Sequence, residues 1–271
     1  MADLRQVTKN LDRKTRVRIF ELRLLREADW SEMAFDAFAI VLEESRTSER
    51  AFETLVGSSH AVGNDFQIQR FKASTPLDIA ADMKRLQLNW NYPLNHEPPT
   101  MAQGLSKNPY QSRNPMAVIA CALSHYRLWL RCAKSNRPLL VLEHDAMFLR
   151  KTPVHRLLAK CSYDIVGLND PRGATRRASH FHRAVRRSHG SFLETPWVDE
   201  PSIPQGLAGN SSYLLRVSGA KKLISLVALH GLWPNDAIMN KQLLPRKIGV
   251  TRKYYTTVQK NLQSTTREMA D

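Results

Sequence analysis

Two acidic residues, Glu143 and Asp145, flank His144 directly after the apolar run Leu139–Leu142. Four consecutive apolar residues predict a buried strand, and ligands of open α/β sheets bind beyond the carboxyl ends of the strands. Two carboxylates at this spacing can approach one hard divalent cation, which keeps positions open for diphosphate oxygens. The alternative use of these residues is a solvated acidic turn after the strand.

The elements around this motif predict an α/β fold with a mainly parallel central sheet flanked by helices. Short apolar or alternating runs typical of strands alternate with longer stretches typical of helices. Strands are expected at 37–42, 66–71, 139–142, 163–168 and 211–215, and helices at 46–56, 116–132 and 218–229. Residues 91–115 hold five of the 14 prolines and are expected to form a long loop, after which Asn114-Pro115 favours a helix start.

The chain is expected to form one domain, residues 31–271, preceded by a charged helical extension, residues 1–30. Hydrophobic residues make up 42% of the 271 residues, which is enough for a sizeable core and excludes a disordered chain. Cys121, Cys132 and Cys161 are odd in number and lack a CxxC pair, which argues against a disulfide scaffold or a zinc site. We see no secretory signal or membrane-length apolar run, so we expect a cytoplasmic protein of a bacterium or a virus-infected cell.

The charge of the chain is unusually positive. Forty Lys and Arg residues against 25 Asp and Glu give a net charge of +15, which attracts polyanions such as nucleic acid or a phosphorylated glycan. The stretch from Pro171 to Leu193 contains no acidic residue and is expected to form a solvated basic loop. It carries six arginines, Arg172, Arg176, Arg177, Arg183, Arg186 and Arg187. We expect them to bind phosphate groups of an acceptor.

Several motifs in collinear order, spread over about residues 37–266, resemble those of glycosyltransferase family 25. This family includes lipopolysaccharide-biosynthesis and collagen galactosyltransferases. The matching segments are ACALSH (120–125), LEHDA (142–146), YDIVGL (163–168), GNSSYLL (209–215), GAKKL (219–223), WPND (233–236) and QS (263–264). The family usually has three acidic residues in its metal motif, and here His144 replaces the middle one.

The resemblance implies a fold of the GT-A type, a UDP-sugar donor, a Mn²⁺ or Mg²⁺ cofactor and transfer with inversion at the anomeric carbon. Glu143, His144 and Asp145 would contact the donor, and Glu143 and Asp145 would hold the metal. Ser124 and His125 would line the donor site. Arg46 and Arg50 would meet the nucleotide, because a guanidinium group suits a diphosphate.

An inverting transferase also needs a general base near the acceptor hydroxyl. Asp236, which follows Gly231-Leu232-Trp233-Pro234, is the first candidate, although it could instead cap a helix. Asp170, just beyond the strand that ends at Leu168, is the second, and Asp199 and Glu200 come behind it.

The acceptor is predicted from the charge. The arginines favour DNA that carries a hydroxymethylated base such as 5-hydroxymethylcytosine, as in viral DNA modification, since such a base offers a hydroxyl nucleophile. The family favours an anionic saccharide of lipopolysaccharide or capsule. A third possibility is a non-catalytic nucleic-acid-binding protein that keeps the fold, but the retained Glu143 and Asp145 argue against it.

Overall fold

The computed structural model describes residues 34–173, 177–260 and 262 of the chain. The predicted helix at 1–30, the candidate Arg176 and the Gln263-Ser264 motif lie outside these residues. Among the helices of the described residues, none is long and apolar enough to cross a lipid bilayer.

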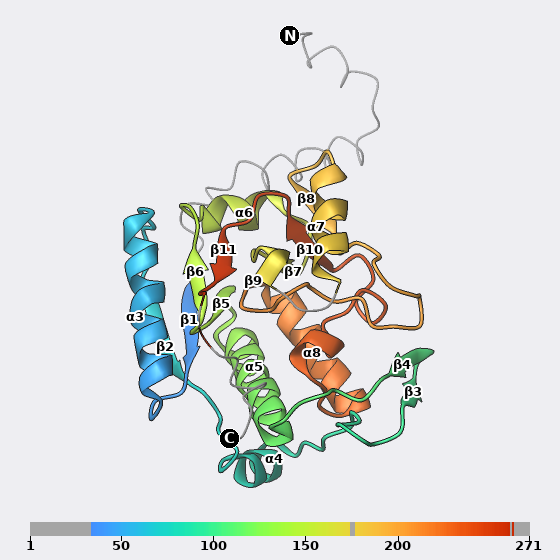
Figure 1. Cartoon of the computed structure of the whole chain (residues 1–271). Coiled ribbons are helices and arrows are strands. Elements are labelled where there is room, and N and C mark those ends of the chain that lie inside the picture. The colour runs from blue at the N-terminus through green and yellow to red at the C-terminus, as the bar shows by residue number, and fades with distance from the viewer. Residues whose placement is uncertain (1–33, 174–176, 261, 263–271) are drawn as a thin grey trace, which may run out of the picture. The chain divides into compact units, whose positions relative to one another are not determined.

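A seven-stranded sheet lies at the centre (Figure 1), with the strand order β2-β1-β5-β9-β7-β10-β8. The strands are β1 (Asp36–Val41), β2 (Ile68–Lys72), β5 (Leu139–Glu143), β7 (Ile165–Gly167), β8 (Phe192–Glu194), β9 (Ser212–Leu215) and β10 (Ile248–Thr251). β1 pairs in parallel with β2 and β5, and β7 with β10, whereas β9 is antiparallel to both β5 and β7, and β8 to β10. All strands except β8 and β9 therefore run in one direction, which confirms the expected mainly parallel sheet.

Helices flank this sheet. They are α3 (Arg46–Ala61), α4 (Ile79–Leu86), α5 (Pro115–Ser135), α6 (Val154–Lys160), α7 (Ala178–Arg187), α8 (Val217–His230) and the short α9 (Asn235–Ile238), with a 3₁₀ turn η2 (Pro171–Gly173). α5 and α8 pack against each other, whereas α3 contacts β1 (Figure 1). Alternate residues of β1 serve the two faces: Phe38 and Ile40 belong to the core cluster that includes α5, while Ala37 and Ala39 are buried outside that cluster.

Helix α5 begins where the Asn114-Pro115 pair predicts. The Asn114 side chain accepts a hydrogen bond from the backbone N–H of Ala117 at 3.1 Å, and Pro115 occupies the first turn. This cap fixes where the helix begins and therefore which residues face the sheet: Leu123, His125 and Trp129 are all buried.

Two segments expected to be loops contain regular structure. Residues 91–115 include the hairpin β3 (Thr100–Ala102) and β4 (Leu105–Lys107). The arginine-rich stretch forms η2, α7 and β8 rather than an open loop, because Phe181 and Val185 lie one turn apart on α7 and are both buried. A further two-stranded pair joins β6 (Ala146–Phe148) to β11 (Thr256–Val258).

Candidate functional site

The Glu143-His144-Asp145 motif lies at the carboxyl end of β5, between the neighbouring strands β1 and β9. On one side, the backbone N–H of His144 donates to the Ile40 carbonyl of β1 at 3.2 Å. On the other, the N–H of Glu143 donates to the carbonyl of Ser211, just before β9, at 2.8 Å. The sheet therefore fixes the backbone of the motif at the edge where the parallel strands β1, β2 and β5 end.

A buried chain of hydrogen bonds behind the motif orients Glu143. His125 of α5 places Nε2 at 3.1 Å from Glu143 Oε1 and Nδ1 at 2.9 Å from the Tyr213 hydroxyl. The Trp129 indole N–H donates to that hydroxyl at 3.0 Å. Since the indole can only donate, Tyr213 is free to donate its own proton to Nδ1, and we infer the tautomer in which Nε2–H of His125 donates to Glu143.

The pKa values of the two carboxylates of the motif are shifted in opposite directions. Burial acts to raise the pKa of Glu143, but the hydrogen bond from His125, together with the electrostatic effects of His125 and His144, outweighs it, and the pKa is lowered. Burial, and then the negative charge of Glu143, raise the pKa of Asp145 to about 7. Burial is also the largest effect on His144, and it lowers the pKa of that side chain. Glu143 therefore keeps its negative charge, and that charge opposes the ionisation of Asp145.

A divalent cation fits this pair. Asp145 Oδ1 is buried and has no hydrogen-bond partner among the described residues, although a carboxylate oxygen normally has one when it is removed from water. Oxygen ligands of this kind are what Mg²⁺ and Mn²⁺ prefer. The adjacent carboxylates and the unsatisfied oxygen therefore favour the metal site predicted from the sequence.

Another set of possible ligands lies nearby, formed by Cys121, His125 and Glu143, whose ligand atoms lie within 4.8 Å of one another. Both ring nitrogens of His125 are already engaged by Tyr213 and Glu143. Burial, followed by the charges of Glu143, Asp236 and Asp145, raises the pKa of the Cys121 thiol well above its usual value, which disfavours the thiolate that binds metals. We therefore assign His125 to orienting Glu143.

Asp236 lies in α9, on the wall of a pocket with a volume of about 290 Å³. Its side chain is exposed there, but the surrounding protein displaces much of the bulk water. This desolvation, followed by the negative charge of Glu143, raises the pKa of Asp236. The structure thus brings Asp236 close enough to the β5 motif for the charge of Glu143 to affect it, although about 90 residues separate them in sequence.

Another part of the pocket wall, the backbone around Gly206, lies very close to α9. A Cβ atom at Gly206 would lie 2.5 Å from the Asp236 carbonyl oxygen and 2.9 Å from that of Met239, so only glycine allows the approach. The pocket is lined by three aromatic residues, Tyr92, Tyr110 and Phe181, by polar residues that include Asn108, Gln111 and Gln205, and by Arg177 and Asp199. Arg177 and Asp199 form an ion pair of 3.6 Å at its edge.

Asp170 occupies a different environment from Asp236. It is buried beyond β7, and the Arg172 guanidinium donates to both of its carboxylate oxygens, at 2.7 Å from Nη2 to Oδ2 and 3.1 Å from Nε to Oδ1. Burial acts to raise the pKa of Asp170, but the hydrogen bonds and charge of Arg172 outweigh it and lower the pKa. A carboxylate engaged in this way is a weaker base than Asp236.

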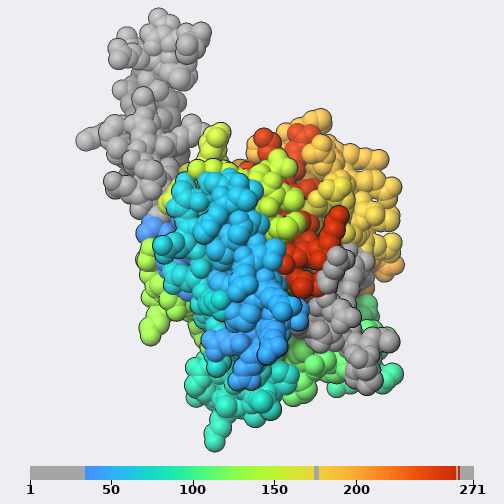
Figure 2. Space-filling model, turned by 60° about the vertical axis from the view of Figure 1, so that its left-hand side comes forward, coloured from blue at the N-terminus to red at the C-terminus, as the bar shows by residue number. Residues whose placement is uncertain are grey.

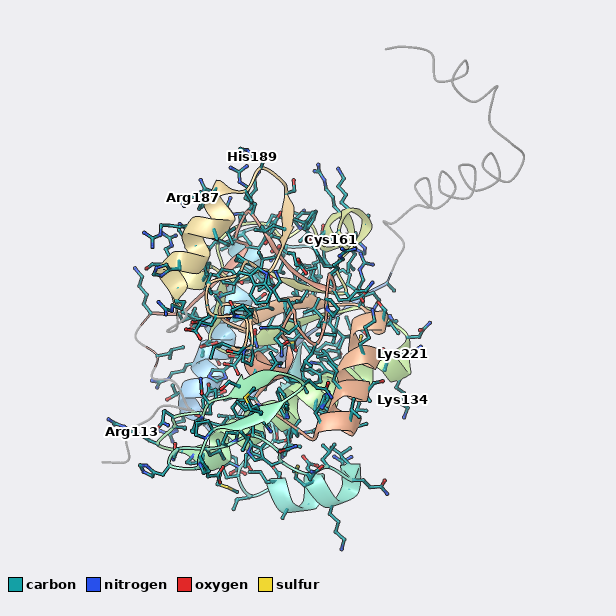
Figure 3. The ribbon with its side chains drawn as sticks, turned by 90° about the vertical axis from the view of Figure 1, so that its right-hand side faces the viewer. Arg113, Lys134, Cys161, Arg187, His189 and Lys221 are labelled. Atoms are coloured by element: carbon teal, nitrogen blue, oxygen red, sulfur yellow. The ribbon has the colours of Figure 1, made fainter. Side chains whose placement is uncertain are left out.

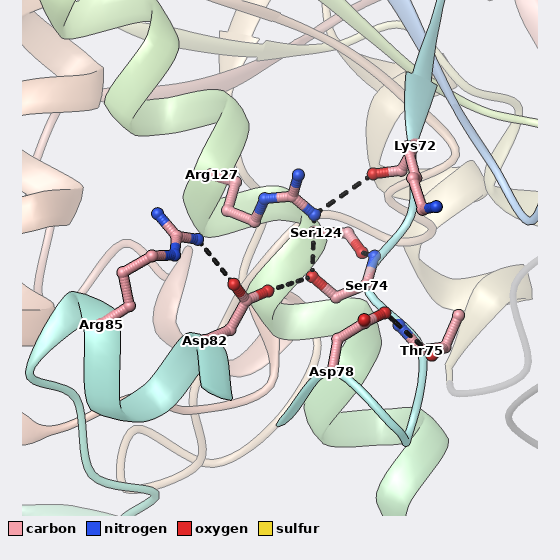
Figure 4. A network of polar contacts seen from close by, with 8 residues as sticks. All are labelled: Lys72, Ser74, Thr75, Asp78, Asp82, Arg85, Ser124 and Arg127. Carbon is pink, nitrogen blue, oxygen red and sulfur yellow. Dashed lines mark hydrogen bonds and ion pairs between the residues drawn. The ribbon is translucent and has the colours of Figure 1, made fainter. Parts of the chain in front are cut away.

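Ser124 and His125, which were predicted to line the donor site, are fully buried behind the edge of the sheet that carries the Glu143-His144-Asp145 motif. Ser124 Oγ accepts a hydrogen bond of 2.8 Å from the backbone N–H of Ser74, which follows β2 (Figure 4). Arg127 of α5 donates to the Ser74 hydroxyl and to the Lys72 carbonyl, and Ser74 in turn donates to Asp82 of α4. This network ties the end of β2 to α5.

The predicted nucleotide contacts, Arg46 and Arg50, are exposed on the first turns of α3, directly after the carboxyl end of β1. Among the predicted acceptor contacts, Arg183, Arg186 and Arg187 are exposed on α7. Arg172 and Arg177 instead pair with Asp170 and Asp199. Arg176 is outside the described residues. Glu200 is exposed near Asp199.

Two groups of residues near the motif were missed in the sequence. Asn210, Ser211 and Ser212 lie beside the end of β5, and their side-chain polar atoms are buried without partners among the residues described. The polar string GNSS before an apolar strand was the available signal. Gln259, just after β11, donates from its amide to the carbonyls of Ala51, His144 and Ala146, and Figure 2 shows this C-terminal segment beside α3. Nothing in the local sequence indicates that role.

A family model matches the part of the chain that carries these features. The family model of glycosyltransferase family 25, described as lipopolysaccharide biosynthesis proteins, matches residues 64–239. The comparison with curated proteins gives no match. Among solved structures, the apo form of mouse xyloside xylosyltransferase 1 is similar over 79% of this chain and 83% of its own, with 10% identity and a TM-score of 0.38. The family match covers well over half of the chain, spans the β5 motif and reaches Asp236, and the chain therefore belongs to glycosyltransferase family 25 and is a glycosyltransferase.

Proposed function

We propose that this protein is a metal-dependent inverting glycosyltransferase that moves a sugar from a UDP-sugar to a hydroxyl group of a saccharide acceptor. The observation that carries the proposal is the packing of α9, which holds Asp236 on the wall of a pocket, against α5, whose His125 hydrogen-bonds to Glu143 of the β5 motif. A donor held at the carboxylates and an acceptor held in the pocket would meet at this point.

Glu143 and Asp145 would hold Mn²⁺ or Mg²⁺, with His125 fixing the orientation of Glu143. When bound, the cation would neutralise negative charge on the departing nucleoside diphosphate. The exposed guanidinium groups of Arg46 and Arg50 are available to the nucleotide, since both lie just after the end of β1. The buried amide and hydroxyl groups of Asn210, Ser211 and Ser212 are available to hydrogen-bond the sugar or phosphate.

Asp236 serves as the general base. As the acceptor oxygen bonds to the anomeric carbon and the bond from that carbon to the diphosphate breaks, the acceptor proton passes to the Asp236 carboxylate. The raised pKa makes Asp236 a better proton acceptor at neutral pH than an ordinary aspartate. Asp170 is the weaker candidate because Arg172 occupies both of its oxygens.

The pocket favours a saccharide as acceptor. Its volume, about 290 Å³, is close to the lower end of the roughly 300–1,000 Å³ of small-ligand pockets. Aromatic rings next to amide side chains, as with Tyr92, Tyr110, Asn108 and Gln205, are suited to the apolar faces and hydroxyl groups of a sugar. DNA with a hydroxymethylated base is the second candidate, favoured by the exposed Arg183, Arg186 and Arg187 of α7.

The test is UDP release in the presence of Mn²⁺ across a panel of UDP-sugars, with phosphorylated and neutral saccharides or with DNA containing 5-hydroxymethylcytosine. We expect release stimulated by a saccharide and abolished in Glu143→Gln, Asp145→Asn and Asp236→Asn. Glu53→Gln, an exposed acid on α3, is the matched control and should keep full activity. Stimulation by the modified DNA alone would replace the saccharide with DNA, and no release under any condition would support a non-catalytic protein.

A further inference from the structure

A second pocket lies at the opposite end of α7 from the one that contains Asp236. Arg177 and Phe181, at the start of α7, line the Asp236 pocket, whereas His189, just after the helix, lines the second. The helix has 10 residues and is therefore about 15 Å long. The second pocket has a volume of about 280 Å³ and is formed by α6, the segment before β8 and the segment after β10. Figure 3 shows Arg187 and His189 at this end of α7.

Positive charge is concentrated in this pocket, which we call the basic pocket. Arg156 and Lys160 come from α6, Arg252 and Lys253 follow β10, and His189 completes the set; no acidic side chain is among the described residues that line it. None of these five forms an ion pair with any acid that the structure describes, whereas Arg172, Lys222 and Lys241 elsewhere on the molecule do. Like charges gathered in a concave site repel one another, and an anion relieves that repulsion.

The position of Arg252 indicates what kind of anion fits. Its backbone N–H donates to the Ser191 carbonyl at 3.0 Å, which fixes the residue against the opposite wall of the pocket. Its side-chain Nε is buried and has no acceptor among the described residues. The turn that carries Ser191 is tight, since a Cβ atom at Gly190 would lie 2.9 Å from the Phe192 carbonyl oxygen. A held guanidinium with an unsatisfied N–H is suited to the oxygens of a phosphate group.

We propose that the basic pocket binds a phosphate group carried by the saccharide acceptor, about one helix length from the hydroxyl that reacts at Asp236. The assignment to the acceptor rests on the proposed function; the phosphate site itself does not. A phosphate monoester at the end of a sugar can enter a pocket of this size, whereas the phosphodiester backbone of a duplex runs along an exposed surface. Arg183 and Arg187 are exposed on α7, the helix that runs from one pocket to the other, and add positive charge there.

The experiment is calorimetric titration of the full chain with inorganic phosphate and with glucose 6-phosphate, in EDTA and without donor, so that transferase activity plays no part. The pocket variant is Arg156→Gln with Arg252→Gln. The matched control, Lys134→Gln with Lys221→Gln, removes the same charge at exposed positions outside the pocket. We expect saturable binding of both probes, weakened about tenfold or more in the pocket variant and less than about twofold in the control.

Other outcomes identify other sites. Equal weakening in both variants would show that net charge alone attracts phosphate, and weakening by Arg46→Gln with Arg50→Gln would place the phosphate at the donor edge; either overturns the proposal. A short DNA duplex that loses affinity in the pocket variant, while the phosphate probes do not, would overturn it in favour of nucleic acid. Arg252→Lys should recover part of the affinity, and the exposed Lys253→Gln gives a second pocket variant if the double substitution unfolds the protein.

Discussion

Gly206→Ala tests whether the close approach between the pocket wall and α9 positions Asp236. A Cβ atom at residue 206 would lie 2.5 Å from the Asp236 carbonyl oxygen, and ordinary contact begins at 3.4 Å. The atoms must therefore separate by 3.4 − 2.5, about 0.9 Å. Because the Asp236 and Met239 oxygens are both backbone atoms, they can move only if α9 moves with them.

A displacement of this size should affect the reaction more than donor binding. A shift of about 1 Å in a reacting group can slow a reaction about 100-fold, so we expect kcat to fall by about 10- to 100-fold. The KM for the UDP-sugar should change less than about twofold, because Glu143 and Asp145 lie at the end of β5 and do not move with α9. Overpacking should also lower the free energy of unfolding by about 1–3 kcal/mol.

The assay is steady-state UDP release at saturating acceptor, together with urea unfolding of each variant. Gly57→Ala is the matched control: nothing lies within 4 Å of the added Cβ, and it lies inside α3, where alanine should stabilise by about 0.5–1 kcal/mol. A folded Gly206→Ala protein with the wild-type kcat would refute the positioning of Asp236 by this contact. So would a variant in which kcat and the donor KM change together.

Three further changes test the motif and its surroundings. Asp145 keeps its proton to about pH 7 in the folded protein but to about pH 3.8 when unfolded, so the metal-free protein should lose stability as pH rises between these values. Asp145→Asn should remove this loss in urea unfolding, and Mn²⁺ should raise the Tm of the wild type but not of this variant. Gln259→Ala deletes three hydrogen bonds to backbone carbonyls, of 2.8, 3.2 and 3.0 Å, and should cost about 1–3 kcal/mol and raise the Mn²⁺ concentration for half-maximal activity; an unchanged metal requirement would contradict this. Asn210→Ala should leave the free protein at least as stable, because neither amide atom has a partner among the described residues and removing a buried unsatisfied amide recovers its desolvation cost, yet it should raise the donor KM; a large loss of stability with an unchanged KM would assign Asn210 to the fold.

The parts of the site that could be predicted from the sequence depend on local patterns. The apolar run before Glu143 predicts β5, and Asn114-Pro115 predicts the start of α5. The spacing of Phe181 and Val185 on α7 carried the same kind of signal. The density of arginines around them nevertheless led to a loop prediction, and burial of the apolar pair is what makes the segment helical.

The rest of the site depends on contacts between distant segments. His125 and Tyr213 are 88 residues apart in sequence, and their hydrogen bond exists because β9 inserts antiparallel between β5 and β7. No local pattern predicts that strand order. The basic pocket likewise draws Arg156, His189 and Arg252 from three segments, and the sequence shows only that each is basic. Concavity and the absence of nearby acids among the residues described come from the fold.

The distribution of unsatisfied polar groups supports both proposed ligand sites. Nine buried side-chain polar atoms lack a hydrogen-bond partner among the described residues. Five of them belong to Asp145, Asn210, Ser211 and Ser212, beside the end of β5, and a sixth is Arg252 Nε in the basic pocket. Each such group costs about 1–3 kcal/mol, so a fold selected for stability alone would not concentrate them. Where they gather, a ligand that supplies the missing partners recovers that free energy on binding, which is how a site gains affinity for a polar, charged donor and acceptor.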